Sequence, residues 1–129
     1  MRLRACLLIC AILLACTGNL GPPQPLDGVW RLATAHSPLD PRTLTLTQRE
    51  STVTGTGNAL GVDVPISVAV TGTATLPLVV LTFRYGDLGN GTDTARYTAM
   101  LESDGRLVGE VVYDSVFGGR TDSLTFAKQ

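Results

Sequence analysis

The sequence predicts an all-β protein that folds into a single antiparallel, eight-stranded up-and-down barrel. From residue 26 onward, polar and apolar residues alternate with a period of two, as in the run R-T-L-T-L-T-Q at 42–48. Threonine and valine, which favour strands, are abundant. Closure into a barrel removes both exposed sheet edges. A two-sheet β-sandwich would give nearly the same pattern, so it stands as the alternative.

The alternating runs predict eight strands, at 27–34, 42–49, 52–59, 64–73, 77–85, 94–102, 106–113 and 120–127. The connections after the second, fourth and sixth strands are short, whereas those at 35–41, 60–63, 86–93 and 114–119 are longer. Odd and even connections of a meander lie at opposite ends. We therefore expect one end closed by tight turns and a mouth at the other end surrounded by longer loops.

One hairpin can be assigned a register. Residues 102–106 read E-S-D-G-R, which is typical of a type I turn followed by Gly105 in the left-handed conformation. This three-residue loop pairs Glu102 with Arg106, and further along it pairs 101 with 107, 99 with 109, and 97 with 111. The register keeps the apolar residues of both strands on one face.

The N-terminal segment has the layout of a secretory signal. Arg2 and Arg4 precede an apolar run at 5–14, and the small residue Ala15 stands directly before Cys16. About ten apolar residues are too few to span a bilayer, which needs about 20. We expect a signal peptide at 1–15, a tether rich in glycine and proline at 16–25, and the barrel domain at 26–129.

The sequence L-L-A-C at 13–16 resembles the lipobox of bacterial lipoproteins. That resemblance implies a diacylated Cys16, carrying chains such as palmitate, as the mature N-terminus. It therefore implies an exported protein of the cell envelope, attached to the membrane through its N-terminal lipid. Thr17 is not the aspartate that resembles an inner-membrane retention signal, so an outer-membrane location is expected where the cell has one. An ordinary cleaved signal peptide is the alternative.

The composition limits which partners and cofactors we expect the protein to bind. Loss of Arg2 and Arg4 with the signal leaves eight basic and eleven acidic residues, a net charge of −3 that does not favour nucleic acid. After Cys16 the chain has no cysteine, and it has one histidine, which excludes a His/Cys zinc site. We expect no metal and no cofactor.

The tripeptide Gly28-Val29-Trp30, at the start of the first strand, resembles the opening signature of the calycin superfamily, to which the lipocalins belong. The resemblance implies a lipocalin-like barrel with Trp30 closing one end and a small hydrophobic ligand, such as an acyl chain, in the interior. It also implies an arginine near the end of the last strand, stacked on the tryptophan. Arg120 begins that strand at the opposite end, and the residue near the expected place is Lys128.

The phase of the alternation predicts which residues point inward: Trp30, Leu32, Leu44, Leu46, Val53, Ile66, Val68, Val79, Leu81, Phe83, Tyr97, Val111, Leu124 and Phe126, together with the small residues Gly55, Gly57, Ala99 and Gly109. Phe83 and Tyr97 are candidate lumen contacts for a ligand. The small residues either leave a cavity or let a narrow barrel coil tightly.

The same phase places candidate ligand-binding residues at the inner rim of the mouth: His36, Tyr85, Tyr113, Arg120 and Asp122. The guanidinium of Arg120 could bind the carboxylate of a small acid. Alternatively, Arg120 and Asp122 form a solvated ion pair with each other.

Two functional hypotheses follow. The first is a lipid-anchored module that binds a small hydrophobic ligand in its barrel. The second is a non-enzymatic structural or protein-interaction module with a filled core, whose partner would be another envelope protein. The sequence contains no G-x-S-x-G motif and no P-loop, and a lone histidine is poor ground for a nucleophilic triad, so no enzymatic activity is expected.

Overall fold

The computed structural model describes residues 24–61, 64–86, 93–114 and 118–129, and the regular structure in these ranges is entirely β. The predicted signal peptide (1–15) and Cys16 lie outside the described residues, as do parts of three of the longer connections. The strands are β1 (Gly28–Leu32), β2 (Thr43–Arg49), β3 (Thr52–Ala59), β4 (Ile66–Thr75), β5 (Leu78–Tyr85), β6 (Thr94–Leu101), β7 (Leu107–Tyr113) and β8 (Thr121–Lys128).

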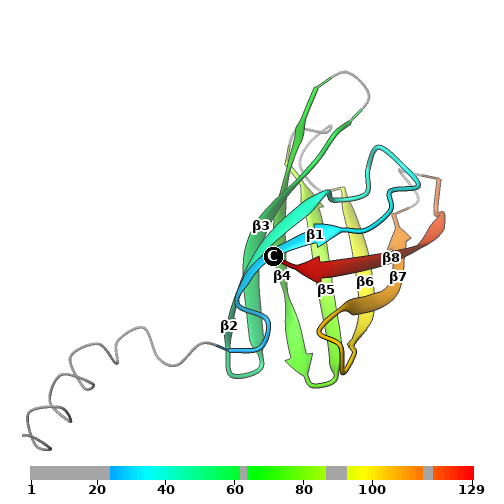
Figure 1. Cartoon of the computed structure of the whole chain (residues 1–129). Coiled ribbons are helices and arrows are strands. Elements are labelled where there is room, and N and C mark those ends of the chain that lie inside the picture. Colours follow the sequence, from blue (N-terminus) through cyan, green and yellow to red (C-terminus); the bar gives the residue numbers. More distant parts are fainter. Residues whose placement is uncertain (1–23, 62–63, 87–92, 115–117) are drawn as a thin grey trace, which may run out of the picture.

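The eight strands form one closed antiparallel barrel in sequence order (Figure 1). Closure comes from β1, which pairs with β2 on one side and with β8 on the other, where Trp30 lies opposite Lys128 and Leu32 opposite Phe126. The last residue extends this pairing, because the Gln129 N–H donates to the Val29 carbonyl at 2.8 Å. The predicted up-and-down barrel is therefore confirmed, and the sandwich alternative is excluded.

The predicted strand boundaries needed two corrections. The fourth strand was predicted at 64–73, but β4 is shifted by two residues because Pro65 has no N–H to donate and pairing continues to Thr75. The turn after it is formed by Leu76 and Pro77 rather than near Ala74. The first strand was predicted at 27–34, but β1 ends at Leu32.

The hairpin between β6 and β7 has the predicted register. Leu101 pairs with Leu107, and Ala99 pairs with Gly109. Gly105 adopts a φ of 87°, and its N–H donates to the Glu102 carbonyl at 2.9 Å. Turn chemistry and side-chain alternation thus agreed because both require the same three-residue loop.

The two ends of the barrel differ as expected. The short turns after β2, β4 and β6 lie together at the lower end in Figure 1, and the described chain also begins there. We call this the closed end, and the opposite end the mouth. The segment 33–42 connects β1 to β2 at the mouth, and we call it the β1–β2 loop. It lies over the end of the barrel, where its contacts are described below.

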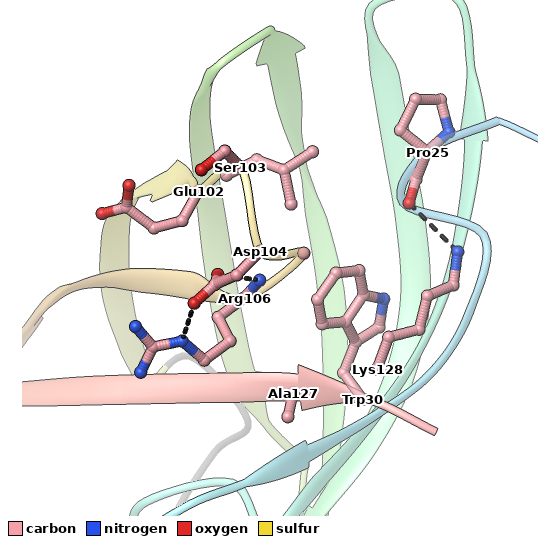
Figure 2. Close-up of a pocket in the computed structure, with 10 residues that line it drawn as sticks. Pro25, Trp30, Glu102, Ser103, Asp104, Arg106, Ala127 and Lys128 are labelled. Carbon is pink, nitrogen blue, oxygen red and sulfur yellow. Dashed lines mark hydrogen bonds and ion pairs between the residues drawn. The ribbon is translucent and has the colours of Figure 1, made fainter.

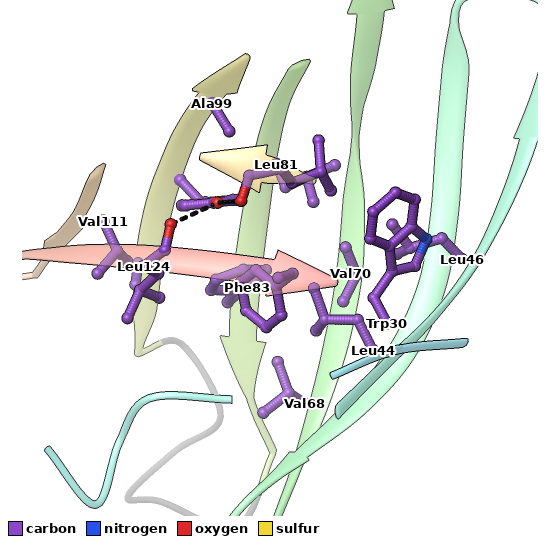
Figure 3. Close-up of a cluster of buried hydrophobic side chains, with 14 of the residues drawn as sticks. Trp30, Leu44, Leu46, Val68, Val70, Leu81, Phe83, Ala99, Val111 and Leu124 are labelled. Carbon is purple, nitrogen blue, oxygen red and sulfur yellow. Dashed lines mark hydrogen bonds between the residues drawn. The ribbon is translucent and has the colours of Figure 1, made fainter. Parts of the chain in front are cut away.

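The interior is filled by side chains from all eight strands (Figure 3). Every large inward residue predicted from the alternation is buried, with an exposed fraction of 8% or less. Phe83 stacks on Tyr97 with ring centroids 5.8 Å apart, and Tyr97 meets Phe126 edge-on at 5.5 Å. These three rings, from β5, β6 and β8, pack together in the barrel interior.

Gly109 shows what the small inward residues do. A Cβ at this position would overlap the Thr98 carbonyl oxygen and lie 2.5 Å from the Ala99 Cα on the neighbouring strand. The same crowding occurs at Gly55, where a Cβ would overlap the Thr45 carbonyl oxygen. Glycine at both positions lets adjacent strands approach closely in a tightly coiled barrel, which is the second of the two predicted roles.

Candidate functional site

At the mouth, two of the residues predicted as ligand contacts, Tyr85 and Tyr113, hold the β1–β2 loop together with a residue that the sequence did not single out. Asp40, in the β1–β2 loop, is fully buried. Its Oδ1 accepts a hydrogen bond from the Tyr113 hydroxyl, at the end of β7. Its Oδ2 accepts hydrogen bonds from the backbone N–H groups of His36 (2.7 Å) and Ser37 (2.9 Å). Asp40 therefore joins its own loop to the end of β7.

Two further contacts fix the β1–β2 loop across the mouth. The Tyr85 hydroxyl, at the end of β5, donates to the Leu39 carbonyl at 2.7 Å. The Gly61 N–H, beyond β3, donates to the Pro38 carbonyl at 3.1 Å. The loop is thus held by β5, by β7 and by the segment after β3. Tyr85 and Tyr113, predicted as ligand contacts, serve here as donors that hold the loop.

Burial sets the ionisation of the two mouth tyrosines. Desolvation raises the pKa of the Tyr85 hydroxyl above its ordinary value. Desolvation also raises the pKa of Tyr113, and the neighbouring Tyr85 and the Asp40 carboxylate raise it further. Both hydroxyls therefore remain protonated, which is the state in which they can donate to the loop.

The other predicted mouth residues lie apart from this network. The His36 side chain is exposed, and the loop uses its backbone N–H instead. Arg120 and Asp122 form the predicted ion pair, with Nη2 3.2 Å from Oδ2. That oxygen is buried without a hydrogen bond of good geometry, and the Arg120 side chain is about half exposed. Such a pair contributes about 1 kcal/mol or less to stability.

The side chain of Tyr97, predicted as a lumen contact, is held in the interior by hydrogen bonds to the backbone of β7 and β8. Its hydroxyl donates to the Leu124 carbonyl at 2.9 Å and also approaches the Leu107 carbonyl at 3.3 Å. Desolvation raises the pKa of Tyr97, so its hydroxyl stays a donor. Phe83, the other predicted lumen residue, is fully buried against it.

Trp30 lies at the closed end, where it is 1% exposed (Figure 2). Its indole N–H donates to the Leu26 carbonyl at 2.9 Å. The Lys128 ammonium lies 5.7 Å from the ring centroid and donates to the Pro25 carbonyl at 3.1 Å. The lipocalin resemblance implied an arginine on the tryptophan, and Lys128 stands in that place instead. A surface pocket of about 370 Å³ lies beside this pair.

The start of the described chain is fastened at the same end by Asp27 and Gln48. Asp27 Oδ2 accepts from the Gln24 N–H at 2.9 Å, and Oδ1 accepts from the Gln48 N–H at 2.6 Å. Gln48 is buried in an inward position, where its amide accepts from the Leu26 N–H and donates to the Glu50 carbonyl. Asp40 and Gln48 were not predicted as functional residues. The sequence signal for Gln48 was a polar residue in an inward position of the alternation. The signal for Asp40 was the S-x-x-D run at 37–40, directly before Pro41.

Asp27 should make stability depend on pH in the acid range. Hydrogen bonds from the backbone of Gln24 and then of Gln48 hold its pKa below the ordinary value. Its contribution is therefore present above about pH 4, the unfolded pKa, and is lost as the pH falls further. We expect Asp27→Asn to lose less stability than wild type between neutral pH and pH 2 in urea unfolding. Glu110→Gln, which removes one exposed carboxylate, is the control; equal acid dependence of wild type and Asp27→Asn would contradict the assignment.

Within the described ranges, no three His, Cys, Asp or Glu side chains gather as a metal site would require. The same ranges contain no helix long and apolar enough to cross a bilayer. No protein-family model matches the chain, and no curated protein or solved structure is detectably similar to it.

Proposed function

We propose that this chain is a lipid-anchored protein of the cell envelope, whose filled barrel acts as a non-enzymatic structural or interaction module. The observation that carries the proposal is the Tyr97 side chain, which lies inside the barrel with its hydroxyl on backbone carbonyls, its ring stacked on Phe83 and in edge-on contact with Phe126. An acyl chain in the lumen would have to displace these rings. Each aromatic side chain buries about 150–250 Å², so displacement is costly.

The closure of the mouth supports the same proposal. A ligand entering from that end would have to break the hydrogen bonds from Tyr113 to Asp40 and from Tyr85 to Leu39. A hydrogen bond of this kind contributes about 0.5–1.5 kcal/mol, and one to a charged group such as the Asp40 carboxylate contributes about 1.5–3 kcal/mol. The geometry thus favours a barrel that presents its outer surface to a partner.

The lipid anchor is supported by the sequence of 1–16 and by where the barrel begins. Eight peptide units separate Cys16 from Gln24, so a lipid on Cys16 would lie within about 29 Å of the closed end. That end exposes the apolar side chains of Leu76, Leu78 and Met100, of which the last two are paired neighbours. We therefore orient the closed end toward the membrane and the mouth away from it.

Mass spectrometry of protein purified from its own cells tests both parts. For the wild type we expect an acyl mass that persists on denaturation, and no further mass under native conditions. Cys16→Ser should lose the covalent mass and leave the membrane fraction, whereas Cys10→Ser, within the signal, should keep both. An acyl mass that is absent from the wild type would exclude the anchor. A native-only mass, released on denaturation, would instead establish the acyl-carrier hypothesis.

Gly109→Leu separates the two roles of the small inward residues. Because a side chain here meets the Thr98 and Ala99 backbone, we expect a loss of about 1–3 kcal/mol from overpacking, measured by urea unfolding. Val108→Leu, on the outer side of the same strand, is the control and should change stability by less than about 0.5 kcal/mol. A Gly109→Leu protein of unchanged stability would indicate spare volume in the lumen and would count against a filled barrel.

A further inference from the structure

The outer wall of the barrel carries a continuous row of threonines. Thr47 on β2 lies opposite Thr54 on β3, which lies opposite Thr71 on β4, which lies opposite Thr82 on β5. All four are exposed. Adjacent strands are about 4.8 Å apart, so the hydroxyls repeat at about that interval across the wall. The row continues onto β6, where Thr82 lies opposite Arg96.

Two arginines stand at the β5–β6 end of this wall. Arg84 lies opposite Thr94 and Arg96 lies opposite Thr82, so the two are diagonal neighbours on the outer face. Their separation is about 7–8 Å at the backbone. Both side chains are exposed, and neither forms an ion pair among the residues that the structure describes. Glu110, which the register places diagonal to Arg96 on β7, does not pair with it either.

A shallow recess of about 310 Å³ lies next to Arg84 on the same wall. Its lining includes Gly57, Ala69 and Gly86, whose side chains are small or absent, with Thr56 beside them. The recess lies on the next outward row, where Thr56 pairs with Ala69 and Ala69 with Arg84. A chain bound beside the threonines can therefore approach the backbone closely there. The row from β2 to β6 crosses four strand spacings, about 19 Å, which suits an extended polymer.

We propose that this wall, defined by Thr47, Thr54, Thr71, Thr82, Arg84 and Arg96, binds a polysaccharide that carries carboxylates. Threonine hydroxyls both donate and accept, as sugar hydroxyls do, and unpaired guanidinium groups bind carboxylates through two parallel hydrogen bonds. The wall has no aromatic side chain, so it lacks the anchors of protein interfaces and the stacking platforms of single-stranded nucleic acid. The inference deepens the proposed interaction module by naming its partner class.

Calorimetric titration of the protein, purified from its own cells in mild detergent, tests the inference. Polygalacturonate is the anionic probe, and dextran is the neutral probe. We expect polygalacturonate to bind at least about tenfold more tightly than dextran, because a hydrogen bond to a charged group contributes about a factor of ten or more. Arg84→Gln and Arg96→Gln should each weaken polygalacturonate binding about tenfold.

Controls separate this surface from general charge attraction. Arg31→Gln removes the same charge from the exposed face of β1, four strands away around the barrel from β5, and should leave the affinity unchanged. Thr54→Val with Thr71→Val removes two hydroxyls and no charge, and should weaken binding. Thermal melts of each variant verify that the barrel is intact.

Three outcomes would overturn the inference: no binding of polygalacturonate, equal binding of dextran, or equal losses in Arg31→Gln and Arg84→Gln. None of them depends on acylation of Cys16 or on the content of the lumen. An absent lipid or a native-only ligand mass would therefore refute the proposed function. Whether the outer wall binds a polysaccharide would still be decided by this titration alone.

Discussion

Replacement of Asp40 by alanine is expected to destabilise the barrel by about 3–5 kcal/mol. The change removes the carboxylate that accepts hydrogen bonds from the Tyr113 hydroxyl and from the backbone N–H groups of His36 and Ser37. A lost hydrogen bond to a charged group costs about 1.5–3 kcal/mol, and a buried donor left unpaired costs about 1–3 kcal/mol. Urea unfolding should show a lower midpoint with an unchanged slope.

Two variants assign that loss to the hydrogen-bond network. Asp40→Asn keeps the shape and one carbonyl acceptor, so it should lose less than alanine does. Tyr113→Phe removes one donor and should cost about 1–2 kcal/mol. Because Asp40 and Tyr113 share a hydrogen bond, the double variant Asp40→Ala/Tyr113→Phe should be less destabilised than the sum of the single losses. Additive losses, or an Asp40→Ala protein within 0.5 kcal/mol of wild type, would show that the loop is not held in this way.

Replacement of Trp30 by alanine is expected to cost about 3–5 kcal/mol, the range for a buried aromatic residue. The indole is almost fully buried at the closed end, and its N–H is bonded to the Leu26 carbonyl. Its removal opens a cavity and leaves that carbonyl without its donor. Trp30 is the only tryptophan, so unfolding should be followed by far-ultraviolet circular dichroism rather than by fluorescence.

The variants Trp30→Phe and Lys128→Met separate the contributions of the indole and of the lysine ammonium to this stability. Phenylalanine keeps most of the apolar contact but loses the N–H, so it should cost less than alanine. Lys128→Met keeps the apolar stem over the ring and removes the cation, which should cost about 0.5–1 kcal/mol. If Lys128→Met were as damaging as Trp30→Ala, the ammonium and not the indole would be the main element of the closed end.

Much of the fold could be predicted because two local rules agreed. Side-chain alternation placed residues such as Leu44, Leu81 and Leu124 in the interior, and all are buried. The Gly105 turn then fixed the register of β6 and β7. Closure could not be predicted in the same way, because a period of two does not distinguish β1 pairing with β8 from two separate sheets.

The arrangement of the mouth was harder to predict because it depends on contacts between distant residues. Asp40 and Tyr113 are 73 positions apart, and no local pattern links them. The phase of the strands placed Tyr85 and Tyr113 at the mouth, but a phase does not extend into a loop. His36 was therefore expected to point inward, whereas its side chain is exposed and only its backbone takes part.

The pairing of β1 with β8 places the first and last described residues at the same end of the barrel, where the Gln129 N–H reaches the Val29 carbonyl. A short linker could therefore join residue 129 to residue 24. A circular permutant with new termini in the exposed turn at 103–105 would keep every strand pairing, and its new ends would leave beside the old ones. The same proximity would let the barrel be inserted into a surface loop of a host protein, with the β1–β2 loop at the far end unaffected.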